Sequence, residues 1–109
     1  MKQNELILEL EGKASEDAYE GNTYDIDVSV FEKVVIHIFE IGASNGITYS
    51  IDTSLKGLRW RNVASAAIAA SGNAGEALTD PVERIRIQIK STVGGNAGKF
   101  NLYVRGLPA

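Results

Sequence analysis

The sequence predicts an all-β protein: a single antiparallel β-sandwich, jelly-roll-like, of about eight short strands. Segments in which apolar and polar residues alternate recur at spacings of roughly 8–15 residues, as expected of half-buried strands. Clusters of glycine, asparagine and proline separate these segments, and no segment has a sustained helical period. The 109 residues are close to the commonest domain size. We therefore expect one domain over residues 1–109, with residues 1–4 as a flexible N-terminal segment.

Composition excludes several classes of protein. Hydrophobic residues make up 44% of the chain, which is enough for a real core. The formal net charge of −3, from 14 acidic and 11 basic residues, argues against a nucleic-acid partner, because phosphate binding requires a concentrated basic surface. The absence of cysteine excludes disulfides and thiolate metal sites. Without a signal-peptide pattern or an apolar stretch of about 20 residues, we expect a soluble protein made in the cytoplasm, with no membrane partner.

Two strands are expected in the first 30 residues. Leucines at alternate positions predict a strand over residues 6–11 that ends at Gly12, and the polar stretch 13–22 predicts a loop. Residues 24–30 alternate again and predict the second strand. The side chains expected to point inward from it are Tyr24, Ile26, Val28 and Val30.

The most apolar strand is expected next. After a short connection at residues 31–33, residues 34–41 are apolar on both faces apart from His37 and Glu40. This pattern indicates a central strand covered on both sides, either within the protein or by a neighbouring subunit. We interpret His37, the only histidine, as a satisfied core or interface side chain.

Residues 46–63 predict a β-hairpin around which the core forms. Tyr49 and Ile51 alternate with polar residues in the first arm, and Trp60, the only tryptophan, lies in the second. We expect Trp60 to pack on the first arm inside the core, because aromatic pairs add roughly 0.5–1.5 kcal/mol beyond the area they bury.

The segment that follows the hairpin is ambiguous. Its alanines favour helix, but the Ser-Gly-Asn-Ala-Gly run at residues 71–75 would stop a helix early. We expect a short strand of small residues over 65–70, followed by a flexible loop. Residues 82–93 then show the clearest alternation in the chain, and the glycine-rich segment 94–98 predicts a hairpin loop to a last strand over 100–105.

The acidic residues form no recognisable catalytic or metal motif. Asp25, Asp27 and Asp52 are the nearest approach to a calcium site, but acids that alternate along a strand usually form its solvated side. Glu32 and Glu40, with Asp52, lack the defined separation that glycoside hydrolysis requires. We therefore expect no catalytic residue, no metal, no cofactor and no enzymatic activity.

Basic residues line two of the predicted strands. Arg59 and Arg61 lie on one, and Arg84, Arg86 and Lys90 lie on the other. If the two strands are neighbours, this basic patch could meet an acidic partner surface. Alternatively, both are solvated faces balanced by the many acids, and the sequence leaves both interpretations open.

The run YSIDTSLKGLRWRNV and the later strand RIRIQI resemble a pattern common in small β-sandwich proteins of tailed-phage virions. The matching positions are Tyr49, Ser50, Asp52, Gly57, Trp60, Arg84–Ile89 and Gly106. The resemblance spans residues 34–106 and implies a capsid decoration, or cement, protein on the virion surface. It implies the major capsid protein as partner and a homo-oligomer, commonly a trimer.

Contacts with such a partner are expected from segments that can order on binding. These are residues 1–4, the loop 13–22 and the small-residue stretch 64–75, together with the two basic strand faces. The candidate partner-binding residues are Lys2, Asn4, Glu16, Tyr19, Arg59, Arg61, Arg84 and Arg86.

The hairpin also resembles that of discoidin-like, galactose-binding β-sandwiches, although residues 53–57 stand where Asp-Gly is usual in that family. A carbohydrate-binding module is therefore the alternative, and it would need an exposed aromatic platform. The residues available for a platform are Tyr19, Tyr24, Trp60 and Tyr103. A neck or tail protein of the virion is a further alternative, and a hydrolase is a third class.

Overall fold

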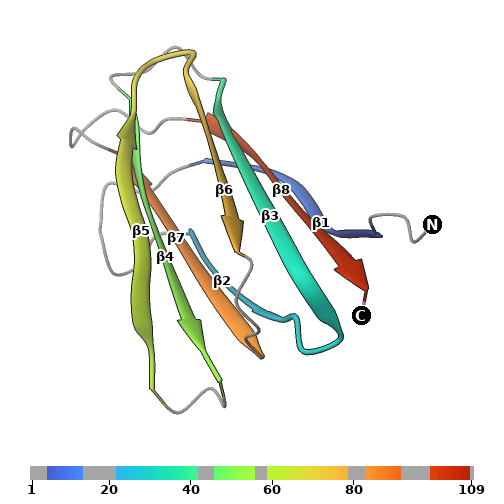
Figure 1. Cartoon of the computed structure of the whole chain (residues 1–109). Helices are drawn as coiled ribbons and strands as arrows, with labels where there is room; N and C mark the ends of the chain where they lie inside the picture. The colour runs from blue at the N-terminus through green and yellow to red at the C-terminus, as the bar shows by residue number, and fades with distance from the viewer. Residues whose placement is uncertain are drawn as a thin grey trace.

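Two four-stranded antiparallel sheets pack face to face in the computed structural model shown in Figure 1. The structure describes residues 5–13, 22–41, 46–55, 59–78, 83–91 and 99–108. The strands are β1 (Glu5–Lys13), β2 (Asn22–Asp27), β3 (Phe31–Glu40), β4 (Ile47–Ser54), β5 (Arg61–Ile68), β6 (Asn73–Leu78), β7 (Arg84–Ser91) and β8 (Lys99–Pro108). The predicted all-β sandwich is confirmed.

The strand order is that of a jelly roll. One sheet has the order β1-β8-β3-β6 and the other the order β2-β7-β4-β5, and every pairing is antiparallel. Among these strands, only β4 and β5 are neighbours both in sequence and in a sheet, so the predicted 46–63 hairpin does pair. No helix occurs in the described ranges, and hence none that could cross a bilayer.

The glycine-rich segment 94–98 does not join a hairpin, contrary to the prediction. β7 and β8 lie in different sheets, so residues 92–98, which lie outside the described residues, connect one sheet to the other. A local cluster of glycines predicts where the chain turns. It does not predict which sheet the next strand joins, because that depends on where the strand buries its apolar side.

The core lies between the sheets and is made by alternate residues of strands from both. The isoleucines of β7 are at most 1% exposed, as predicted from their alternation. Full burial of each such side chain contributes about 1.5–3 kcal/mol. The buried hydrophobic residues are Val28, Val34, Ile36, Ile38, Ile47, Tyr49, Ile51, Ile68, Ile85, Ile87, Ile89, Phe100, Leu102 and Val104.

The alanine-rich segment forms one long strand, a tight turn and a second strand. β5 runs through Ala64 without a break, so the two strands predicted there are one, and β6 occupies part of the predicted loop. Ser71 takes up a left-handed conformation (φ 61°) in the turn, which the Gly72 amide closes by donating to the Ala69 carbonyl at 2.9 Å. Because β6 contains a glycine and an asparagine, its alternation was not recognised in the sequence and is visible only in its burial pattern.

The connection between β2 and β3 lies three residues earlier in the chain than the predicted 31–33. The Asp27 side chain accepts a hydrogen bond from the Ser29 amide at 2.9 Å, and the Phe31 amide donates to the Val28 carbonyl at 3.0 Å. The chain therefore turns over Val28–Phe31. Val30, predicted to face inward, is 67% exposed, and Phe31 already belongs to β3.

A hydrogen bond crosses between the two sheets. Tyr49 of β4 donates its hydroxyl to the Glu76 carboxylate of β6 at 2.7 Å. Burial, together with the hydrogen bond to this acid and its negative charge, raises the pKa of Tyr49 to about 12. The predicted core role of Tyr49 is confirmed, because its side chain is almost fully buried.

Candidate functional site

Trp60 lies on the outside of the sandwich, which corrects the prediction that it packs with Tyr49 in the core. Its ring contacts the Arg86 guanidinium, whose central carbon is 4.4 Å from the ring centroid. Arg86 points outward because its neighbours along β7 are buried. Across the hairpin Tyr49 faces Ala66 instead. The hairpin pattern predicted the pairing of the two arms, but a register shift next to Ile51 changes which residues meet.

The outer surface of the β2-β7-β4-β5 sheet carries two ion pairs. Arg84 contacts Asp25 at 2.7 Å, and Arg86 contacts Asp52 at 3.0 Å. We call this surface, defined by these four residues and Trp60, the ion-pair face. Its arginines and acids are held by one another and do not form a cluster of one sign.

Further hydrogen bonds extend this network across the sheet. Asn62 of β5 donates to Asp52 at 2.9 Å, and the Ser65 hydroxyl donates to the Asn62 side chain at 3.3 Å. Ser50 and Gln88 make a longer contact of 3.5 Å between β4 and β7. The polar groups of the ion-pair face are therefore used largely to join neighbouring strands.

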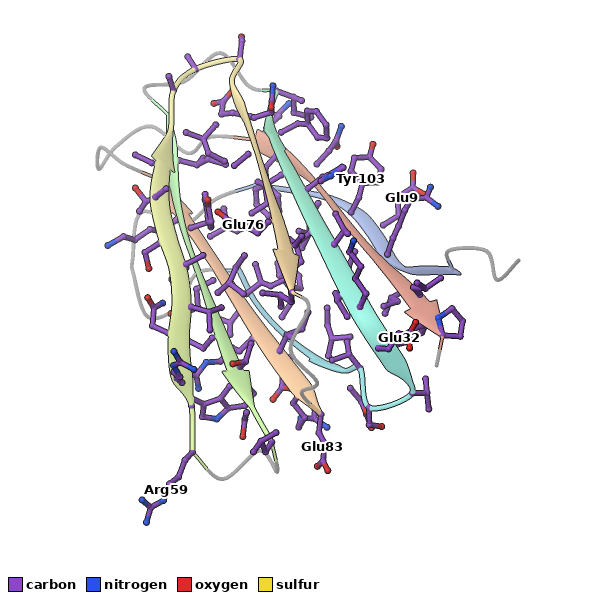
Figure 2. All side chains as sticks on the ribbon, viewed as in Figure 1. Glu9, Glu32, Arg59, Glu76, Glu83 and Tyr103 are labelled. Atoms are coloured by element: carbon purple, nitrogen blue, oxygen red, sulfur yellow. The ribbon has the colours of Figure 1, made fainter. Side chains whose placement is uncertain are left out.

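The predicted basic patch would require β5 and β7 to be neighbours, and β4 lies between them. Arg84 and Arg86 are engaged by acids, whereas Arg59 and Arg61 are exposed at the start of β5. Figure 2 shows Arg59 projecting from the lower end of the sandwich. A partner role for these four arginines stays a prediction. The other candidates, Lys2, Asn4, Glu16 and Tyr19, lie outside the described residues.

The acidic residues are dispersed. Asp25 and Asp52 lie on strands that β7 separates, and within the described ranges no three histidine or acidic side chains gather to hold a metal. Glu40 is only 2% exposed at the end of β3, whereas Glu32 is exposed on the same strand. These carboxylates therefore do not face one another across a shared cleft.

Aromatic rings gather on the outer surface of the other sheet. The Phe39 ring lies 6.4 Å from that of His37 and 5.9 Å from that of Tyr103, measured between centroids. Adjacent rings meet edge to face, at 86° and 82°. We call this surface, defined by these three residues, the aromatic face. Figure 2 shows Tyr103 on this side of β8.

The alternation of β3 places these rings outside. Ile36 and Ile38 are buried in the core, so His37 and Phe39 point to solvent. Gly75 of the edge strand β6 faces His37, where an added Cβ would lie 3.2 Å from the His37 Cδ2 atom. The expectation of a core histidine is wrong, because His37 is exposed, while the interface interpretation stays a prediction.

Two basic residues border the aromatic face. Lys33 of β3 and Arg105 of β8 are exposed on the same side of the sheet, and neither forms an ion pair with another described residue. The one described side chain of opposite charge on β1, Glu9, lies opposite Tyr103. This composition suits binding, since it offers apolar rings with basic groups at the margin.

The platform expected of a carbohydrate-binding module does not assemble as predicted. Tyr103 and Trp60 lie on opposite surfaces of the sandwich, and Tyr24 is half-buried with its ring edge-on to Phe100 at 6.4 Å. The ring that meets Tyr103 is that of Phe39, which in turn meets the His37 ring, and both come from β3. Residues 34–41 were predicted to form a strand covered on both sides, so the exposure of these two rings was not predicted.

No protein-family model matches the chain, and no curated protein matches its sequence. Solved structures do share its fold. PirA superposes with a TM-score of 0.63 at 12% identity, over 88% of this chain and 92% of PirA. The PBSX exported protein XepA gives a TM-score of 0.58 at 17% identity, over 98% of this chain and 37% of XepA. CBM32-1 from a family 31 glycoside hydrolase of Clostridium perfringens gives 0.50 at 19% identity, over 87% and 75%. At these identities the similarity shows the β-sandwich fold alone.

Proposed function

We propose that the chain is a non-enzymatic capsid decoration protein, which binds major capsid subunits of a virion through its aromatic face. The observation that carries the proposal is a group of adjacent rings on one rigid sheet, in which His37 and Phe39 are exposed and Tyr103 is partly exposed. Aromatic residues are enriched at the centres of protein interfaces and dominate their binding free energy. Because β-strands already hold these rings in place, little conformational freedom is lost on docking.

Two further features support a virion partner. The hairpin and the arginine–isoleucine strand resemble those of tailed-phage virion proteins, and jelly rolls are common in viral capsid domains. Binding between shell subunits would stabilise the shell by mass action, since separating the subunits would also break the added interface. The basic border formed by Lys33 and Arg105 favours a capsid surface with acidic residues around an apolar centre.

The proposal also includes the homotrimer that the resemblance implies and contacts made by segments outside the described residues. Lys2, Asn4, Glu16 and Tyr19 would add contacts if their segments order on the capsid surface. Their contribution would come in addition to the aromatic face. It would increase affinity without changing which surface docks.

A carbohydrate-binding module is the second candidate, and the same rings together with the CBM32-1-like fold favour it. The geometry of the rings favours the capsid protein. A flat sugar chain stacks on coplanar aromatic faces, whereas adjacent rings here are rotated by 82° and 86°. Edge-to-face rings form an uneven apolar surface, which suits a complementary protein surface better.

The test is co-sedimentation of the purified protein with expanded capsids of the virus whose genome encodes it. We expect the double variant Phe39→Thr/Tyr103→Thr to bind at least tenfold more weakly, since interface aromatics each contribute about 2 kcal/mol or more. The matched control, Ser50→Ala/Gln88→Ala on the ion-pair face, should bind as the wild type does. Unchanged binding by the aromatic variant would remove this face from the interface, and no binding by the wild type would remove the capsid role.

The carbohydrate alternative needs a probe on the correct surface. Trp60 lies on the ion-pair face, so tryptophan fluorescence would not report on the aromatic face. The ring resonances of His37 and Tyr103 should be followed by NMR while mono- and oligosaccharides are added. Saturable shifts confined to these rings would favour the module over the capsid protein.

A further inference from the structure

Three nitrogen-bearing side chains surround Val35 on the outer surface of the β1-β8-β3-β6 sheet. Lys33 and His37 lie two residues before and after Val35 on β3, and Arg105 lies directly opposite it on β8. The residues that alternate with them are buried in the core, so all four side chains point to the solvent side. We call Lys33, His37 and Arg105 the basic cluster.

The register makes Arg105 a close neighbour of both other members of the basic cluster. Lys33 pairs with Leu107 and His37 pairs with Tyr103, and each of these partners is two positions from Arg105 on β8. Such diagonal neighbours lie roughly 7–8 Å apart, within reach of long side chains. The amine, the guanidinium and the imidazole can therefore converge on one small group.

No described acid neutralises the basic cluster. Glu9 lies one strand further away, opposite Tyr103 (Figure 2), and Glu32 is exposed next to Lys33, yet neither forms an ion pair with a described residue. By contrast, both arginines of β7 hold carboxylates. Like charges close together on a sheet face are destabilising. An acidic group from another molecule would remove this repulsion.

The floor between the basic side chains is low. Val35 is half-buried, and the β6 residues on the same side of the sheet, Gly75 and Ala77, have no side chain or only a methyl group. Gly75 also leaves room for the His37 ring, whose Cδ2 atom would lie 3.2 Å from an added Cβ. A side chain of another protein can therefore reach the basic cluster from the solvent side.

We propose that the basic cluster is a carboxylate-binding site, which takes an aspartate or glutamate side chain of the capsid subunit docked on the aromatic face. Arg105 holds the carboxylate through two parallel N–H donors, Lys33 adds a second positive charge, and His37 donates a ring N–H. The inference rests on the proposed function, because docking on the adjacent rings excludes water from this contact. A capsid surface without the acid leaves both cations unpaired in the interface, so the site selects the partner.

The first experiment tests the site on the free protein. Val35→Glu places a carboxylate of the chain itself among the three basic groups, and Val35→Gln is its uncharged match. Val35→Glu should unfold about 2–5 °C above Val35→Gln at low salt, because opposite charges on neighbouring strands stabilise a sheet. The difference should disappear at high salt. Equal unfolding temperatures at low salt would overturn the site, whatever the capsid binds.

The second experiment tests the partner, by co-sedimentation with expanded capsids. Lys33→Gln/Arg105→Gln should bind at least about tenfold more weakly than the wild type, since unpaired charges in an interface are costly. Val35→Glu, whose own carboxylate occupies the site, should likewise bind more weakly than Val35→Gln. The matched charge removal is Lys90→Gln on β7 of the other sheet, which should bind as the wild type does.

The outcomes separate this site from the proposed function. Binding that is lost in the aromatic double variant but kept in Lys33→Gln/Arg105→Gln would overturn the carboxylate site and leave the capsid role standing. Absence of binding by the wild type would overturn the capsid role, and with it the assignment of the carboxylate to a capsid subunit. Lys33 and Arg105 are exposed, so their double variant provides the test if the Val35 variants fail to fold.

Discussion

On the ion-pair face, Arg84 and Arg86 each hold a carboxylate, whereas Lys33 and Arg105 beside the aromatic face form no ion pair with another described residue. Trp60 on the first surface is covered by a guanidinium, while Phe39 on the second is 38% exposed. Both surfaces come from strands with the same alternation. On the ion-pair face the charged groups pair with one another. The basic groups beside the aromatic face have no ion-pair partner among the described residues, so they are open to contact with another molecule.

The largest effect is expected from Arg86→Met. Asp52 has a side chain that is only 13% exposed, so removal of Arg86 leaves a carboxylate that water can reach poorly. The free energy of unfolding should fall by about 2 kcal/mol, the range for hydrogen bonds to charged groups. Urea denaturation followed by circular dichroism measures the change.

Arg84→Met is the matched control for that variant. Its ion pair with Asp25 involves side chains that are 37% and 46% exposed, and exposed pairs contribute about 0–1 kcal/mol. The cost should therefore be well below that of Arg86→Met. Equal costs would mean that burial does not distinguish the two ion pairs.

Tyr49→Phe tests the hydrogen bond between Tyr49 and Glu76, which joins the two sheets. Loss of the hydrogen bond to Glu76 should lower the free energy of unfolding by about 1 kcal/mol at neutral pH. The pKa of Tyr49 is raised to about 12 in the folded protein, above its unfolded value near 10. Its contribution is therefore complete below pH 10 and is lost as the pH rises toward 12. The stability of the wild type should decline more steeply than that of Tyr49→Phe in this range, as measured by urea titrations.

Local patterns were sufficient for the fold class and for most of the core. The isoleucines of β7 alternate so regularly that their burial followed from sequence, and so did the pairing of β4 with β5. The β6 strand could not be predicted, because Asn73 and Gly75 resemble turn residues unless a neighbouring strand is known. Likewise, the sequence could not show that β7 and β8 join different sheets.

The aromatic face could not be predicted from the sequence for a related reason. A strand that is apolar on both sides gives no sign of which side the opposite sheet covers, so His37 and Phe39 could not be separated from Ile36 and Ile38. Tyr103 comes from β8, more than 60 positions along the chain from either ring. For Trp60 the error was the opposite one. It was predicted to lie in the core but lies outside, because its position depends on Arg86 of another strand.

Phe39→Thr asks whether the aromatic face is dispensable for folding. Threonine keeps a high strand propensity, and Phe39 is already partly exposed, so the change should cost only about 0.5–1 kcal/mol, mostly from lost ring contacts. The same variant should retain the hydrogen-exchange protection of β3. A loss above that of Arg86→Met would show that these rings stabilise the fold, and the contrast between the two faces would disappear.

The smallest expected effect concerns Asp27, at the margin of the ion-pair face and fully exposed. The backbone amide of Ser29, and then its side chain, hold the pKa of Asp27 below its ordinary value. Because the folded pKa is lowered, this contribution to stability is present above the unfolded pKa of about 3.9 and is lost as the pH falls through the folded value. NMR titration of the Asp27 carboxyl carbon in Ser29→Ala should show only a partial return toward the ordinary pKa, since the larger contribution comes from the backbone amide. A complete return of the pKa to its ordinary value would mean that the Ser29 hydroxyl alone stabilises the carboxylate. The backbone of the turn between β2 and β3 would then contribute nothing to the polar contacts at the margin of the ion-pair face.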